Sequence, residues 1–171
     1  MLYVNDYLVT EEIELELVGQ QLKEYLLKEK LIIIKSNQEP MSQDELATLL
    51  KSNEAEFRLV AMHTSILLRE FKEELESYIQ KVETYIEDMR ESEIFSDVLN
   101  GFVQVIEALL EFTSVEKFLQ KSLVNQQQVN ELSTKALTRA EEGNLEYVLD
   151  VLEYEVLPLL QHFLDETNEV V

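Results

Sequence analysis

The chain has 171 residues and a mass of 20.0 kDa, and its 35 acidic side chains outnumber 14 basic ones to give a formal net charge of −21. This length fits one ordinary domain, or a small domain joined to a helical one. A hydrophobic fraction of 46% exceeds that of a disordered acidic tail, and the small content of 3 glycines and 2 prolines favours long helices with short connections. The acidic balance argues against direct binding to nucleic acid or to an anionic membrane, because their phosphates would be repelled.

The sequence contains no cysteine, which excludes disulfides, thiolate zinc sites, iron–sulfur clusters and cysteine nucleophiles. Residues 1–7 lack the basic region and the long apolar stretch of a signal peptide. The longest aliphatic run, Leu31–Ile34, is far shorter than the ~20 residues that a membrane span requires. We therefore expect a soluble protein of the cytoplasm.

Residues 1–63 predict a small α+β module that begins with a hairpin and a helix. The runs 2–4 and 7–9 favour strands, and the Asn-Asp pair between them tolerates the positive φ of a hairpin turn. Apolar residues then recur at three- and four-residue steps, which predicts a helix at 13–29. The β-branched run that follows at 31–35 predicts a buried strand.

A short helix and a last strand complete this module. Ser42 and Glu45 have the spacing of a capping box, which predicts a helix at 43–51. Residues 57–62 favour a strand. Four strands around one main helix have the element order of a β-grasp module, an analogy that carries no function. The alternative is that the whole module is helical, with Ile32–Ile34 buried inside one of the helices.

Residues 64–171 are almost continuously helix-periodic. Apolar stripes at helical spacing predict four helices, at 65–91, 93–112, 114–141 and 145–166. Because short connections favour antiparallel neighbours, we expect a four-helix antiparallel bundle. The predicted fold class is therefore α+β and predominantly α, with a domain boundary between residues 63 and 64.

Polar residues are expected to define several of these helix ends. Thr64 or Ser65 supplies an N-cap oxygen for the first helix of the bundle. Thr113 and Glu116 have the spacing of a second capping box, which would open the third helix. Gly143 fits the left-handed residue just past a helix end.

Three further residues are expected to modify the bundle. Asn144 is the predicted cap of the fourth helix, and Pro158 removes one backbone hydrogen bond and kinks that helix near residue 154. Gly101, beside Phe102, allows another helix to approach closely.

The two histidines do not indicate a catalytic or metal site. A general base needs a partner at hydrogen-bond distance, and none is visible near His63, which we expect to be exposed or locally hydrogen-bonded. Glu166 follows His162 by one helical turn, which predicts a surface ion pair. Di-iron bundles use Glu-x-x-His motifs, whereas Val60 and Leu159 occupy the corresponding Glu positions here.

No other catalytic motif is present in the sequence. Gly19, Gly101 and Gly143 are too widely separated to form a phosphate-binding loop. The chain also lacks a recognisable Ser-His-Asp arrangement and the alternating acidic residues of a calcium loop. We therefore expect no enzymatic activity, no cofactor and no metal.

The last predicted helix carries the candidate binding surface. Residues 145–171 hold seven acidic side chains and no basic one, which by itself is typical of a solvated face that keeps a protein soluble. The functional alternative is a face that docks a basic partner, with two tyrosines seven residues apart as aromatic anchors rather than as boundary packing. Its residues are Tyr147, Asp150, Glu153, Tyr154 and Glu155.

The leading hypothesis is a non-catalytic protein-interaction module: an adaptor, an assembly factor or a chaperone that shields a partner in the cytoplasm. In size, acidity and helical content the chain resembles, in general character, the chaperones of bacterial secretion and flagellar export. One alternative, motivated by the net charge of −21, is a nucleic-acid charge mimic or an immunity protein that binds a basic partner. Another is a regulatory homodimer, with the stripe through Leu149 and Val156 as its seam.

Overall fold

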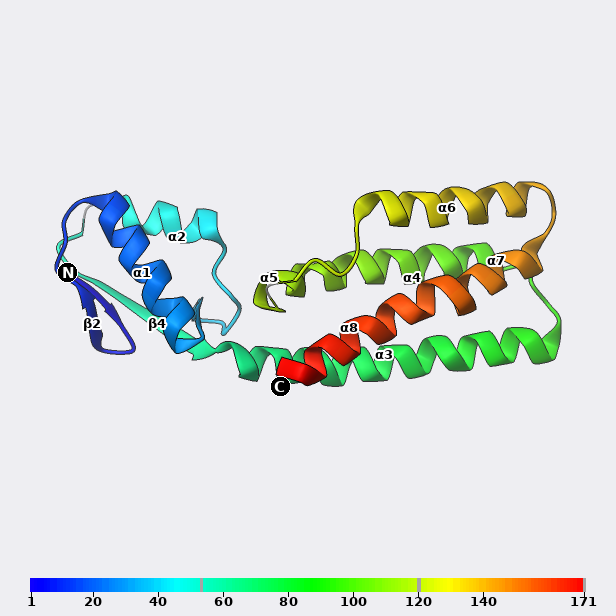
Figure 1. Ribbon diagram of the computed structural model, residues 1–171, viewed down its shortest axis with the longest axis horizontal. Coiled ribbons are helices and arrows are strands. Elements are labelled where there is room, and N and C mark those ends of the chain that lie inside the picture. Colours follow the sequence, from blue (N-terminus) through cyan, green and yellow to red (C-terminus); the bar gives the residue numbers. More distant parts are fainter. Residues whose placement is uncertain (53, 120, 171) are drawn as a thin grey trace. The chain divides into compact units, whose positions relative to one another are not determined.

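The computed structural model describes residues 1–52, 54–119 and 121–170. The chain divides into two compact units, Met1–Leu67 and Leu68–Val171, which are treated separately below (Figure 1). The first unit holds one small sheet, and most of the rest of the chain is helical. The α+β, predominantly α fold class predicted from the sequence is therefore confirmed.

The N-terminal unit contains a four-stranded sheet in the order β2-β1-β4-β3. Strand β1 pairs antiparallel with β2 and parallel with β4, and β3 pairs antiparallel with β4. All four predicted strands form and pair, so the all-helical alternative is wrong. The elements are β1 (Leu2–Val4), β2 (Tyr7–Thr10), α1 (Leu15–Glu29), β3 (Leu31–Ile34), α2 (Gln43–Leu50) and β4 (Phe57–His63).

One face of this sheet packs against both helices of the unit. Successive side chains of a strand point to opposite faces, so alternate residues enter the core. Helix α1 contributes Val18 and Leu22, and α2 contributes Leu50. The buried sheet residues are Leu2, Val4, Ile33, Leu59 and Ala61.

Two local features of the N-terminal unit, the β1–β2 turn and the capping box of α2, form as the sequence predicts. Asn5 and Asp6 both adopt positive φ, at 48° and 66°, in the turn that joins β1 to β2. The Ser42 hydroxyl accepts from the Glu45 backbone N–H at 3.1 Å, and the Glu45 carboxylate accepts from the Ser42 N–H at 2.8 Å. This reciprocal pair satisfies two free donors at the start of α2.

The C-terminal unit is an up-and-down bundle of helical segments that run alongside one another (Figure 1). The first helix, α3 (Thr64–Ser92), begins within the N-terminal unit and enters the C-terminal unit at Leu68. The other segments are α4 (Val98–Phe112), a 3₁₀ turn (Thr113–Val115), α5 (Glu116–Leu119), α6 (Gln126–Glu141), α7 (Leu145–Val151), a π-helical turn (Leu152–Val156) and α8 (Leu157–Val170). The core of the bundle is formed by apolar side chains from helices along the whole unit, including Leu75 of α3, Phe102 of α4, Leu132 of α6 and Phe163 of α8.

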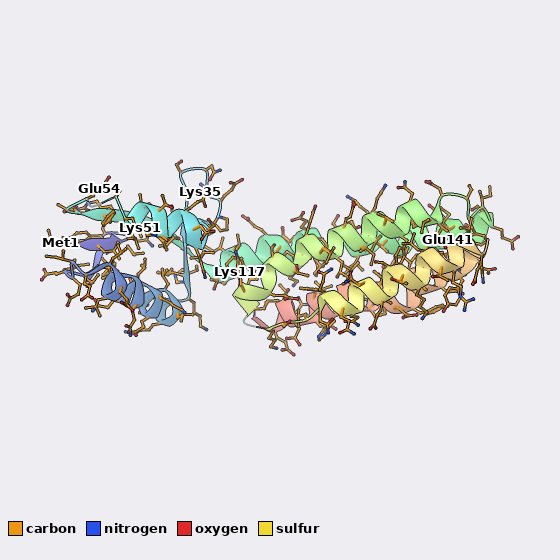
Figure 2. All side chains as sticks on the ribbon, turned by 90° about the horizontal axis from the view of Figure 1, so that it is seen from above. Met1, Lys35, Lys51, Glu54, Lys117 and Glu141 are labelled. Atoms are coloured by element: carbon orange, nitrogen blue, oxygen red, sulfur yellow. The ribbon has the colours of Figure 1, made fainter. Side chains whose placement is uncertain are left out.

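The third predicted helix, at 114–141, is wrong in its first half. The Thr113 hydroxyl donates to the Leu110 carbonyl instead of capping a new helix, so α4 continues through the 3₁₀ turn into α5. The Glu116 carboxylate then accepts from the backbone N–H groups of Leu123 and Val124, both at 3.1 Å. These bonds hold a non-helical segment before α6. Helix α6 ends at Glu141, which is labelled in Figure 2.

Other helix ends differ in smaller ways. Helix α3 begins directly after β4, and the Thr64 hydroxyl donates to the Lys30 carbonyl at 3.3 Å instead of capping α3. Helix α4 begins at Val98, five residues later than predicted, and Ile94 lies exposed before it. Gly143 adopts a φ of 79°, as predicted.

The predicted disturbance near residue 154 takes the form of a π-helical turn. Asn144 accepts from the Tyr147 N–H at 3.2 Å and caps α7, as expected. Pro158 has no backbone N–H to bond the carbonyl of Tyr154, four residues earlier. The chain widens over Leu152–Val156 before α8 continues, which places an extra residue in this part of the bundle.

Candidate functional site

Two of the carboxylates predicted to bind a partner are held inside the C-terminal unit by one arginine. The Arg90 guanidinium of α3 donates to Asp150 at 2.5 Å and to Glu153 at 2.7 Å, and Glu146 lies 3.7 Å away. These hydrogen bonds raise the pKa of Arg90 above its ordinary value, and the bond to Asp150 has the largest effect. The cluster fastens α3 to α7 and the π-helical turn.

Glu155 and Tyr147 also have partners within the unit. The Lys135 ammonium of α6 donates to Glu155, which is the main reason that the pKa of Lys135 is raised. The half-buried ring of Tyr147 lies under two cations of α6, with the Arg139 guanidinium 4.8 Å from its centroid and the Lys135 ammonium 5.7 Å from it. These contacts join α6 to α7.

Among the five predicted residues, Tyr154 is the exposed one, with 67% of its surface accessible. It stands on the π-helical turn between Glu153 and Glu155. The structure therefore brings the five residues to one region, but it uses three of the carboxylates and one of the rings to hold helices together. What remains for an outside partner is a single tyrosine.

The predicted pair of His162 with Glu166 is replaced by another ion pair. The Lys121 ammonium bonds Glu166 and lies 3.5 Å from Glu169. His63 and His162 are both exposed. Within the described parts of the chain, no group of three or more His, Cys, Asp or Glu side chains is placed to hold a metal ion.

The stripe predicted as a homodimer seam is occupied within the bundle. Leu149 and Val156 are fully buried in the core of the C-terminal unit. They therefore offer no surface to a second copy.

The second face of the N-terminal sheet is apolar and is not covered by a helix of that unit. Both α1 and α2 direct their apolar residues to the opposite face. On this open face, Tyr3 pairs with Leu8, Ile32 with Met62, and Ile34 with Val60. Val60 is 60% exposed and Leu8 is 47% exposed. We call these six residues, Tyr3, Leu8, Ile32, Ile34, Val60 and Met62, the open sheet face.

Arg58 is the one charged residue that strand alternation places on this face. Its guanidinium lies 4.7 Å from the centroid of the Tyr3 ring and bonds Asp6 at 3.0 Å and Glu56 at 2.6 Å. Hydrogen bonding to Glu56 is the main reason that the pKa of Arg58 is raised. Its charge is therefore balanced locally, and the apolar side chains give the face its character.

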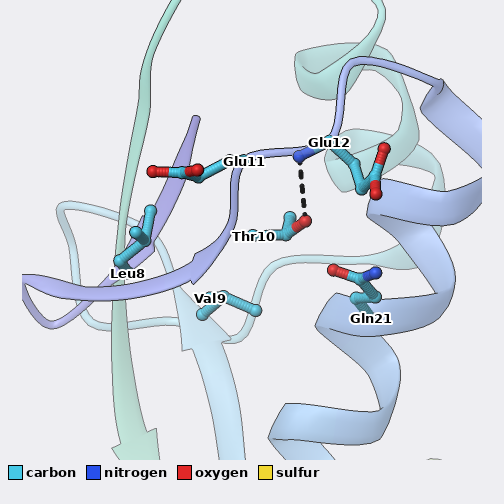
Figure 3. Close-up of a pocket in the computed structure, with 6 residues that line it drawn as sticks. All are labelled: Leu8, Val9, Thr10, Glu11, Glu12 and Gln21. Atoms are coloured by element: carbon cyan, nitrogen blue, oxygen red, sulfur yellow. Dashed lines mark hydrogen bonds between the residues drawn. The ribbon is translucent and has the colours of Figure 1, made fainter.

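A shallow cavity of about 410 Å³ lies between the edge strand β2 and α1 (Figure 3). The backbone N–H of Glu12 donates to the Thr10 hydroxyl at 3.0 Å, and this bond shapes the turn that leaves β2. Two apolar residues of the strand and several polar ones form the lining. These residues are Leu8, Val9, Thr10, Glu11, Glu12 and Gln21.

Sequence reasoning missed the open sheet face because its strands are apolar on both sides. The run Leu31–Ile34 predicts a strand buried on both faces, yet only Ile33 is fully buried. In β4 the outward Val60 and Met62 are as apolar as the inward Leu59 and Ala61. No polar–apolar alternation marks the exposed side, so the contrast that reveals an open face is absent.

One segment, Val98–Leu119, is long and apolar enough to cross a membrane by length and composition, with a mean hydropathy of 1.3. It is α4 with its extension through α5. Its residues Val98, Phe102 and Leu109 are buried in the bundle core. A core helix of a bundle has the same properties, so this single segment is weak support for a membrane span.

In comparisons with known proteins, the chain matches no family model. No curated protein and no solved structure matches it either.

Proposed function

We propose that this chain is a non-catalytic protein-interaction module that acts as an adaptor, an assembly factor or a chaperone for another protein in the cytoplasm. The observation that carries this proposal is the open sheet face. Its six apolar residues come from all four strands, and Val60 and Leu8 expose 60% and 47% of their surface. Contiguous exposed apolar surface of this kind is typical of protein-binding sites.

The distribution of exposed apolar residues supports the same unit. Tyr7, Leu8, Ile13 and Val60 are all exposed, within the first 63 residues of the chain. In the C-terminal unit the exposed large side chains, such as Val103, Leu137 and Tyr154, lie on different helices. Scattered single apolar residues are normal on a protein surface, so the exposed side chains of the C-terminal unit do not indicate a contact.

The test is a quantitative pull-down from lysate of the source organism with three forms of the full chain. These are the wild type, a Leu8→Lys/Val60→Lys variant of the open sheet face, and a Val103→Lys/Leu137→Lys control. Both variants add two positive charges at exposed apolar positions. We expect a stoichiometric partner that the first variant loses and the control retains.

Two outcomes would contradict the proposal. A partner that binds the Leu8→Lys/Val60→Lys variant and the wild type equally well would remove the open sheet face from the account. Recovery of the bait alone, with a single oligomeric state, would remove the interaction role. Circular dichroism of both variants would check that they remain folded.

The alternative of a charge mimic or an immunity protein is motivated by the net charge of −21. The acidic residues of 145–171 support this alternative less well than their number suggests, because several of them already pair with cations of the same chain. Glu146, Asp150 and Glu153 lie around Arg90, and Glu155 pairs with Lys135. Elution in salt steps would distinguish the two functions, since a charge mimic loses affinity by orders of magnitude as ionic strength rises.

A further inference from the structure

The two edges of the N-terminal sheet are not equivalent. At the β3 edge, the chain turns back after β3, and this return segment (residues 35–41) supplies backbone hydrogen-bond partners. The Met41 N–H donates to the Ile33 carbonyl at 2.9 Å, and the Lys35 N–H donates to the Glu39 carbonyl at 2.8 Å. Lys35, labelled in Figure 2, also bonds Glu45 and thereby holds this return segment against α2. The β3 edge is therefore covered.

The β2 edge is open. Strand β2 is the last in the sheet order, and no described strand pairs with its outer side. An edge strand presents a row of free backbone N–H and C=O groups, which proteins commonly protect with lysine or proline. The sequence of β2, Tyr-Leu-Val-Thr, contains neither. One register shift lies near its end, opposite Leu2 and Tyr3, while Tyr7 and Leu8 pair regularly.

The surroundings of β2 specify what an added strand would contain. Leu8 lies on the open sheet face, beside Tyr3. Val9 points to the other side, where it packs against the core next to the cavity lined by Glu11 and Glu12 (Figure 3). Side chains of an added strand would alternate between these two environments. One environment is apolar and the other is acidic.

The charge around the edge is of one sign. Residues 1–22 contain five acidic side chains and no lysine or arginine. Ile13, in the acidic connection from β2 to α1, is 95% exposed and adds apolar surface. A second copy of this chain would bring its own Glu11 and Glu12 to the same place, which like-charge repulsion disfavours. Charge complementarity therefore selects a basic occupant.

We propose that the outer edge of β2 accepts an extended segment of a partner protein, in which apolar residues alternate with lysine or arginine. The segment adds a fifth strand to the sheet. Its backbone bonds the free groups of β2, its apolar residues extend the open sheet face, and its cations lie over the cavity beside Glu11 and Glu12. This inference rests on the proposed function, because it names the chemistry and the binding mode of the partner.

The test uses a synthetic peptide of alternating lysine and valine with the isotope-labelled full chain. Its controls are a glutamate–valine peptide of equal length, and a peptide of the same lysine–valine composition with the lysines grouped at one end. Amide chemical shifts and hydrogen exchange are followed by NMR. We expect the alternating peptide to shift the amides of Tyr7–Glu12 and to slow exchange in β2.

Two variants separate the edge from general electrostatic attraction. Glu11→Lys/Glu12→Lys reverses the charge at the cavity, and Glu73→Lys/Glu74→Lys makes the same change in net charge at exposed positions of α3. We expect the first to weaken binding of the alternating peptide about tenfold and the second to change it less than twofold.

Several results would overturn the inference. These are equal binding of the grouped-lysine peptide, shifts outside the N-terminal sheet, equal weakening by the two charge reversals, or no binding. The proposed function fails by a different result, the absence of any partner in the pull-down. A captured partner that ignores Glu11→Lys/Glu12→Lys would leave the interaction role standing and remove the β2 edge as its site.

Discussion

The phenol ring of Tyr85 lies directly against the backbone of Gly101. A Cβ atom at Gly101 would overlap the hydroxyl and the ring edge of Tyr85, so only glycine permits this contact between α3 and α4. The Tyr85 hydroxyl is buried and has no hydrogen-bond partner among the described residues. The sequence predicts a close helix approach at Gly101, and the structure identifies Tyr85 as the residue that approaches.

Gly101→Ala should therefore destabilise the bundle by about 1–3 kcal/mol, because the added methyl group must displace a packed ring. Gly19→Ala is the matched control, since a Cβ at Gly19 in α1 meets nothing within 4 Å. It should stabilise its unit by about 0.5–1 kcal/mol through helix propensity. Urea unfolding, followed by NMR signals of each unit, measures both effects. The same sign for the two substitutions would contradict this account.

Two half-buried tyrosines of α3, Tyr78 and Tyr85, predict a loss of stability at alkaline pH. Burial raises the pKa of both Tyr78 and Tyr85, and the nearby Glu111 and Asp97 carboxylates add to these shifts. A raised pKa stabilises the folded state below the ordinary tyrosine pKa of about 10, and this contribution disappears as pH rises through the raised values.

A Tyr78→Phe/Tyr85→Phe variant should lose less stability than the wild type above about pH 10. The measurement is the free energy of unfolding at a series of pH values. Lysines with raised pKa values, such as Lys121 and Lys135, lose their ion pairs in the same range. They do so in both proteins, so the difference between the two curves isolates the tyrosines. If the free energy of unfolding falls equally with pH in both proteins, the account is contradicted, because the folded state then does not raise the pKa of the two phenols.

Arg90 should be the most important cation of the C-terminal unit. Arg90→Met leaves Glu146, Asp150 and Glu153 close together without their counter-charge, and it should cost about 1–2 kcal/mol. Arg69→Met, at an exposed position of the same helix, should change stability by less than about 0.5 kcal/mol.

Neutralising the carboxylates in the background of Arg90→Met gives a second check on this cluster. Asp150→Asn/Glu153→Gln should recover part of the loss, because it removes the uncompensated negative charge. Thermal unfolding is measured for the wild type, Arg90→Met, Asp150→Asn/Glu153→Gln, and the variant that combines all three substitutions. Additive effects would contradict the coupling.

The fold was predictable where the signal is local. The Asn5-Asp6 turn, the Ser42–Glu45 capping box and the glycine stop at Gly143 depend on residues within a few positions of one another. The third helix was predicted incorrectly because Glu116 bonds the N–H groups of Leu123 and Val124 rather than capping its own helix. Sequence periodicity does not distinguish these two uses of one carboxylate.

The candidate site was less predictable because it depends on contacts between distant parts of the chain. Arg90 lies 60 positions from Asp150, and nothing in the acidic C-terminal composition indicates that α3 supplies their shared cation. The open sheet face joins Tyr3, Leu8, Ile34 and Val60 through strand pairing. Only the strand order shows that these residues lie together.

Salt should weaken binding of the partner mainly by slowing its association, rather than by speeding its dissociation. The net charge of −21 accelerates the approach of a basic partner, so raising salt from about 0.05 M to about 0.5 M should slow association roughly tenfold. The apolar contact on the open sheet face should keep the dissociation rate nearly constant. Surface plasmon resonance measures both rates. A dissociation rate that rises by orders of magnitude would favour the charge-mimic function instead.

Hydrogen–deuterium exchange of the full chain, free and bound to the partner captured from lysate, tests the central claim most directly. If the N-terminal sheet carries the contact, binding should slow exchange in β2 (Tyr7–Thr10) and β4 (Phe57–His63), and it should leave Leu145–Val156 unchanged. Protection confined to Leu145–Val156, around Tyr154, would contradict the account and place the binding surface on the acidic helix.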